Sequence, residues 1–147
     1  VAAEDQLFAT LDPTSRRYRF PEEREVIVTD TVGFIEDLPK TLIEAFKATL
    51  EELDGADLLL HLLDASDPHV EHHRTSVESI LGELGLEEHP TLIVWNKADL
   101  ADALTLESLR REHGGIAISA TTGEGCEHLL DAVERSLFES GHRTRKA

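Results

Sequence analysis

The chain has 147 residues, 40% of them apolar and 30% charged, which is typical of one soluble globular domain. Its net charge of −16 would repel a phosphate backbone, so we expect no direct DNA binding and no non-specific binding of nucleic acid. No apolar run approaches the roughly 20 residues of a membrane span, and no secretory h-region is evident.

Two residue counts bear on the protein's origin. The single cysteine, Cys126, cannot form an internal disulfide, which is typical of a reducing compartment, so we expect a cytoplasmic protein. Methionine is absent, even at position 1. We therefore expect the chain to be a fragment or trimmed domain of a longer protein.

Strands and helices are predicted in alternation along the chain. Near-continuous apolar runs predict strands covered on both faces, and apolar residues at three- and four-residue steps predict the intervening helices. This alternation favours an α/β architecture with a mostly parallel sheet. In chain order we predict an edge strand over 17–20 in a hairpin with a strand over 26–30, a helix over 40–53, a strand over 57–65, a helix over 70–84 ended by Gly85, a strand over 91–96, a short helix around Leu106 and Leu109, a strand over 115–120, a helix over 126–137 and a frayed basic tail over 141–147.

Polar side chains follow three of the predicted strands. The sequences are DTVG at 30–33, NKAD at 96–99 and SAT at 119–121. In open α/β sheets, ligands bind beyond the carboxyl ends of the strands. The three motifs therefore predict one ligand site along a single edge of the sheet.

The second and third motifs suit a guanine base. An ionised Asp99 can accept two parallel hydrogen bonds from N1–H and the 2-amino group of guanine, whereas adenine would leave that carboxylate unpaired. Asn96 can bridge neighbouring loops, and the Lys97 stem can lie over the purine face. Ser119 and Ala120 would close the far side, with the Ala120 N–H directed at guanine O6.

The first motif suits the phosphate end of a nucleotide. A carboxylate at a strand tip, such as Asp30, can hold a magnesium-bound water. Gly33 lets a backbone N–H approach a terminal phosphate where a Cβ would interfere. Each motif alone also fits an ordinary surface turn, because Asp, Asn, Ser and Gly are common turn residues. Their order, each motif closing an apolar strand, favours the nucleotide site.

With these motifs, three longer runs carry a family resemblance. DQLFATLDPTSRR (5–17), TDTVGFIEDLPKTLIEAFKATLEEL (29–53) and ADLLLHLLDASDP (56–68) resemble the guanine-nucleotide domain of P-loop GTPases, most closely the HflX family. The resemblance implies a P-loop NTPase-type three-layer sandwich, with 1–140 as a partial G domain. HflX proteins bind GTP, hydrolyse it slowly and associate with the large ribosomal subunit, where they can split ribosomes.

The resemblance also implies roles by position. Residues 8–12 look like the first switch, with Thr10 reaching Mg²⁺ and the γ-phosphate, and 30–33 look like the second switch, with Asp30 holding Mg²⁺ through water. The implied GTP-binding residues are Phe8, Ala9, Thr10, Leu11, Asp12, Asp30, Thr31, Val32, Gly33, Asn96, Lys97, Asp99, Ser119, Ala120 and Thr121.

The chain departs from the family pattern in two places. It contains no G-x-x-x-x-G-K-[ST] phosphate loop, which we expect, with the first strand and helix, upstream of Val1. We therefore expect a gap between the strands over 26–30 and 57–65, aggregation, and weak or no GTP binding by this chain alone.

Phe34 stands where Ras-like proteins carry a water-orienting glutamine. We expect it to pack under the switch helix, expect slow turnover and assign no catalytic base.

Two other functions stay open at this point. One is an Obg- or Era-like ribosome-assembly GTPase. The other is a degenerate, non-hydrolysing G domain that serves as an interaction module. A metal site in HVEHHR (69–74) is less favoured than a solvated helix start, and we expect Trp95 and Cys126 to pack in the core.

Overall fold

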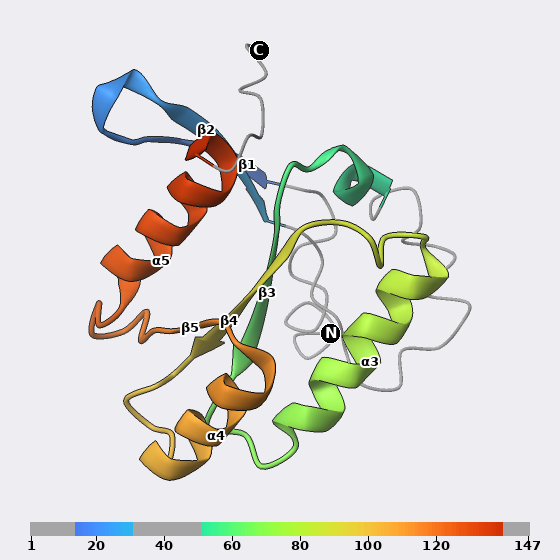
Figure 1. The fold of residues 1–147 in the computed structure, drawn as a ribbon, viewed down its shortest axis with the longest axis vertical. Helices are drawn as coiled ribbons and strands as arrows, with labels where there is room; N and C mark the ends of the chain where they lie inside the picture. Colours follow the sequence, from blue (N-terminus) through green and yellow to red (C-terminus); the bar gives the residue numbers. More distant parts are fainter. Residues whose placement is uncertain (1–13, 31–50, 140–147) are drawn as a thin grey trace, which may run out of the picture. The chain divides into compact units, whose positions relative to one another are not determined.

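The computed structural model describes residues 14–30 and 51–139 (Figure 1). The chain divides into two compact units, residues 1–55 and 56–147, which are described separately. Within the described ranges, the search for a helix long and apolar enough to cross a membrane finds none.

The first unit contains a β-hairpin. Strand β1 (Thr14–Arg19) pairs antiparallel with β2 (Glu25–Asp30), joined through the 3₁₀ turn η1 (Pro21–Glu23), and a second 3₁₀ turn, η2 (Glu51–Gly55), closes the described part. The predicted hairpin is confirmed. Most of the helix predicted over 40–53 lies outside the described residues.

Burial of the second strand differs from the prediction. We expected 26–30 to be covered on both faces, but Ile27 and Val28 are 62% and 49% exposed. Among the described strands, β2 has only β1 as a sheet neighbour. Its apolar run is therefore not enclosed as a central strand would be.

The second unit is a parallel α/β layer structure. Strands β3 (Leu59–Asp64), β4 (Thr91–Asn96) and β5 (Ile116–Ala117) form a parallel sheet in the order β3-β4-β5. This confirms the predicted α/β class. Between and after the strands come α3 (Val70–Glu83), α4 (Ala103–His113), α5 (Cys126–Glu134) and the π turn η3 (Arg135–Glu139).

Strand β5 is shorter than predicted. Only two residues of the expected 115–120 pair as a strand. The Ile118 N–H still donates to Trp95 O at 2.8 Å, but the Ser119 N–H turns away and donates to Glu124 O at 2.8 Å. The backbone thus leaves the sheet to form a loop beside the end of β4.

The core lies between the sheet and two helices. Leu63 of β3 and Trp95 of β4 are register neighbours, and they pack with Val70 of α3 and Leu109 of α4. Trp95 is fully buried, as predicted, and its indole N–H donates to Gly114 O at 2.8 Å. Helices α3 and α4 therefore cover the same face of the sheet, and α5 lies on the other side (Figure 1).

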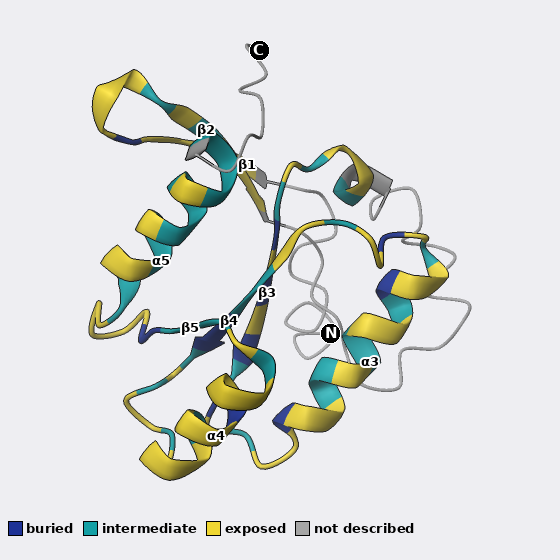
Figure 2. Ribbon diagram, in the orientation of Figure 1, coloured by how far each residue is buried: buried dark blue, intermediate teal, exposed yellow. Residues whose placement is uncertain are grey.

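Strand β3 is covered on one face only. Leu59, His61 and Leu63 are buried, whereas Leu60 and Leu62 are 38% and 57% exposed (Figure 2). The prediction of burial on both faces is therefore wrong for β3, because α3 packs on one face while α5 contacts β5. It holds for β4, whose adjacent residues Val94 and Trp95 are both fully buried.

His61 is a buried histidine that favours its neutral form. It is 8% exposed, and its Nε2 has no hydrogen-bond partner among the described residues. Burial lowers the pKa of His61 below its ordinary value of 6.5, an effect opposed by the charge of Glu78 and assisted by that of Arg74. Its imidazole therefore resists protonation in the folded state.

His61 should make the folded protein less stable as the pH falls. Below about pH 6.5 the unfolded chain binds a proton at His61 that the folded chain does not, so the free energy of unfolding decreases until the folded-state pKa is reached. In His61→Leu, urea unfolding followed between about pH 5 and 7.5 should show a shallower acid decline. Identical slopes in the two proteins would contradict this assignment.

Candidate functional site

The loop after β4 is a tightly bonded turn. Strand β4 ends at Asn96, and Lys97 adopts a left-handed conformation with φ 61°. The Ala98 N–H donates to Ile118 O at 3.0 Å, and the Leu100 N–H donates to Lys97 O at 2.9 Å. These bonds fix the backbone, while the Asp99 side chain stays exposed to solvent.

Asn96 joins this loop to the loop after β5. Its side-chain Oδ1 accepts a hydrogen bond from the Ala120 N–H at 3.1 Å, across 24 positions of sequence. Its backbone oxygen accepts from the Ala65 N–H at 2.9 Å, which ties it to the end of β3 as well. The structure therefore brings NKAD and SAT together at the carboxyl edge of one sheet.

The SAT loop is organised around Ser119. This residue is fully buried, and its Oγ accepts from the Thr122 N–H at 3.1 Å. The loop then enters α5 through Gly125, which has φ 77° and whose Cβ position would overlap the Ala117 carbonyl oxygen. Only glycine fits there. Ala120 and Thr121 are left exposed beside Asn96.

The end of β3 adds a residue that the sequence motifs missed. Asp64 pairs in register with Asn96, and its Oδ2 lies 3.2 Å from Lys97 Nζ. Its Oδ1 accepts from the Ser66 N–H at 2.9 Å and from Ser66 Oγ at 2.6 Å. A polar residue ending a fourth apolar strand was the available signal for this contact.

The ionisation of Asp64 reflects opposing influences. Partial burial raises the pKa of this carboxyl, but the two Ser66 hydrogen bonds and the Lys97 ammonium together outweigh it. The pKa of Asp64 therefore lies below its ordinary value. The side chain is a carboxylate at neutral pH.

Known proteins resemble this chain in sequence. The family described as 50S ribosome-binding GTPase matches residues 1–97. The chain belongs to this family. Curated relatives named GTPase HflX are 49% identical over 92% of the chain in Caldanaerobacter subterraneus subsp. tengcongensis, 53% over 91% in Alkalihalophilus pseudofirmus and 44% over 93% in Escherichia coli. The resemblance to HflX GTPases is confirmed.

The chain spans about a third of the length of these relatives, between 31% and 33%. Two solved structures share its fold. A mutation variant of SsGBP matches with a TM-score of 0.70 and 28% identity, covering 81% of this chain and 46% of that one. A probable GTP-binding protein, engB, matches with a TM-score of 0.51 and 16% identity over 86% of this chain and 83% of that one, and it supports the fold alone.

Most residues predicted for the phosphate end of a nucleotide lie outside the described residues. Asp30 is the last residue of β2, in the first unit, so its placement relative to the NKAD loop is not described. Residues 8–12 and 31–33 lie outside the described residues. The roles assigned to Thr10 and Gly33 stay predictions.

Among the described residues, the histidines of HVEHHR (69–74) are not among the side chains that gather as a possible metal site. His73 Nε2 lies 3.2 Å from Asp67 Oδ2, and His69 begins α3 as its N-terminal cap residue. His72 is exposed. These contacts agree with the favoured interpretation of a solvated helix start.

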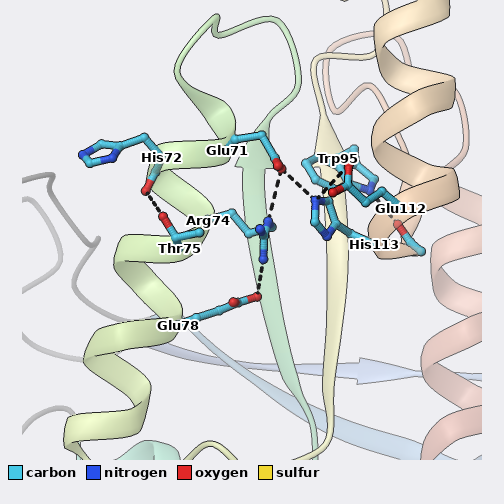
Figure 3. A network of polar contacts seen from close by, with 9 residues as sticks. Glu71, His72, Arg74, Thr75, Glu78, Trp95, Glu112 and His113 are labelled. Carbon is cyan, nitrogen blue, oxygen red and sulfur yellow. Dashed lines mark hydrogen bonds and ion pairs between the residues drawn. The ribbon is translucent and has the colours of Figure 1, made fainter.

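A different polar cluster links α3 to α4 (Figure 3). Its possible metal-binding side chains are Glu71, Glu112 and His113, and His113 Nε2 lies 2.8 Å from Glu71 Oε1. The same Glu71 oxygen lies 3.2 Å from Arg74 Nε, and Arg74 also contacts Glu78 at 2.9 Å. Arg74 and His113 share the Glu71 carboxylate, so these contacts account for the cluster as an interhelical polar network.

Proposed function

We propose that this chain forms the base-recognising part of a domain that binds and hydrolyses GTP in an HflX-like, ribosome-associated GTPase. The observation that carries the proposal is the hydrogen bond from the Ala120 N–H to Asn96 Oδ1. It unites two motifs that suit guanine separately. A purine placed at this edge would meet the exposed Asp99 carboxylate on one side and the SAT loop on the other. The Ala120 N–H, which we expected to be directed at guanine O6, donates to Asn96 Oδ1 in this structure.

Selection of guanine would rest on Asp99. Its carboxylate is exposed next to a backbone fixed by hydrogen bonds, so little reordering is needed before it accepts from the base. Adenine lacks the matching donor pair and would leave the carboxylate unpaired. Lys97, half exposed in the same loop, would lay its methylene stem over the ring.

For the phosphate end of the nucleotide we propose Asp30. A carboxylate at the end of β2 has the chemistry to hold a Mg²⁺-bound water, and Thr10 would supply a hydroxyl ligand. The backbone of Gly33 would contact the γ-phosphate. Phe34 offers no group to orient water, so hydrolysis would be slow and would depend on phosphate-bound groups or on a partner.

The partner in this proposal is the large ribosomal subunit, engaged by the complete protein in the cytoplasm. Support comes from the description of the matched family as 50S ribosome-binding and from relatives named GTPase HflX. Beyond binding to the large subunit, we propose that the complete protein splits ribosomes. The acidic surface of this chain makes a direct RNA contact through it unfavourable.

Nucleotide competition tests this function. The complete parent protein should bind a fluorescent GTP analogue in a Mg²⁺-dependent way, with displacement by GTP and GDP but not by ATP. It should co-sediment with large ribosomal subunits. The 147-residue chain, which lacks G-x-x-x-x-G-K-[ST], should bind GTP weakly or not at all. Equal competition by ATP and GTP in the parent would contradict the proposal.

A further inference from the structure

Asp64 stands out as a charged residue of this edge that the three GTPase motifs do not include. We propose that Asp64 is a positioning residue that holds the Lys97 side chain in place for the base. This inference rests on the proposed guanine site and deepens it. The contact joins the end of β3 to the NKAD loop, two segments that the sequence separates by more than thirty residues.

The sheet register brings the two residues together. Asp64 is the last residue of β3 and Asn96 the last of β4, and the two are paired in the parallel ladder. The next residue, Lys97, turns into the left-handed conformation with φ 61°. Its ammonium then lies 3.2 Å from Asp64 Oδ2.

The two oxygens of Asp64 have different partners. Ser66 donates to Oδ1 through both its backbone N–H and its hydroxyl, which fixes the plane of the carboxylate. Oδ2 is thereby presented to Lys97. Among the described residues, Asp64 is the only ion-pair or hydrogen-bond partner of the Lys97 side chain.

The ion pair is too exposed to serve mainly as a stabilising contact. The side chains of Lys97 and Asp64 are 52% and 36% exposed, and exposed ion pairs contribute little to the stability of a fold. Holding a lysine with four rotatable bonds in one orientation does remove an entropic cost of ligand binding. The pair therefore favours ordering of the loop before the nucleotide arrives.

Asp64→Asn separates an effect on fold stability from an effect on the ordering of Lys97. An asparagine can still accept from Ser66 through its Oδ1 but loses the charge that attracts Lys97. In the complete parent, affinity for GTP and GDP should fall about two- to ten-fold, and the thermal midpoint without nucleotide should stay unchanged. In a Lys97→Ala background the same substitution should have no further effect on affinity.

Glu107→Gln is the matched control. It removes an exposed ion pair with Arg111, at 2.9 Å, elsewhere in the same unit. Nucleotide affinity should not change. If Asp64→Asn binds both nucleotides as the wild type does, or if its effect persists without Lys97, the positioning role is overturned while the proposed function stands.

A second measurement does not depend on nucleotide. The ¹⁵N signal of the Lys97 ammonium can be assigned with Lys97→Arg. Asp64→Asn should increase the internal motion of this ammonium in the complete parent without nucleotide. If the parent binds no guanine nucleotide, the proposed function fails, and this signal decides the Asp64–Lys97 contact separately. Unchanged motion overturns it.

Discussion

Asp99→Asn in the complete parent protein is expected to weaken GTP binding by about 100-fold or more and to strengthen binding of xanthosine triphosphate. The carboxylate accepts from N1–H and the 2-amino group of guanine. Xanthine carries an oxo group at C2, which accepts where guanine donates. An asparagine amide can donate to that oxygen, so the substitution reverses the preference.

Competition of both nucleotides against a fluorescent analogue measures this exchange. Asp99 is exposed at the end of a fixed turn, so its replacement should leave the thermal midpoint nearly unchanged. Leu100→Ala, at the adjacent exposed position, serves as the control and should retain GTP preference. An unchanged base preference in Asp99→Asn would remove Asp99 from its proposed role.

Trp95→Ala is expected to lower the free energy of unfolding by about 3–5 kcal/mol, the largest stability effect we predict. The side chain is fully buried, contacts both helices through the core cluster and donates to Gly114 O at 2.8 Å. Truncation leaves a cavity and an unpaired carbonyl. Because Trp95 precedes Asn96, the base-recognising loop should loosen as well.

Urea unfolding followed by far-UV circular dichroism measures this loss. Fluorescence is unsuitable because Trp95 is the only tryptophan of the chain and the substitution removes it. Leu104→Ala is the control, because Leu104 is 77% exposed and its truncation should change stability by no more than about 0.5 kcal/mol. Trp95→Phe should fall between the two, since it keeps an aromatic ring but loses the indole N–H. A loss below about 1 kcal/mol in Trp95→Ala would contradict the core assignment.

Local patterns of the sequence were sufficient for the elements. The strand over 91–96, the hairpin and the helix ended by Gly85 all appear where apolar spacing and glycine predicted them. Such patterns report which residues exclude water and where the backbone must turn. The same patterns did not predict which faces of the strands are covered by other elements. Leu60 and Ile27 look like core residues in the sequence but are exposed in the structure.

Contacts across the sheet were less predictable. The end of β5 at Ala117 depends on the hydrogen bond from Ser119 to Glu124, which no spacing rule indicates. The pairs Asp64–Lys97 and Glu71–His113 join residues far apart in the chain. A motif search examines neighbours in sequence, whereas these partners are neighbours through strand register and helix packing.

By itself, the sequence determined the α/β class, the resemblance to HflX GTPases and the placement of NKAD and SAT at strand ends. Composition, hydrophobic period and short motifs are local properties of the sequence, so they can be identified without the tertiary structure. Only the tertiary structure decided that Asn96 reaches Ala120, that Asp64 faces Lys97 and that His61 is buried without a partner. These depend on which strands align and in which register, and that alignment is set by packing of the whole sheet against its helices.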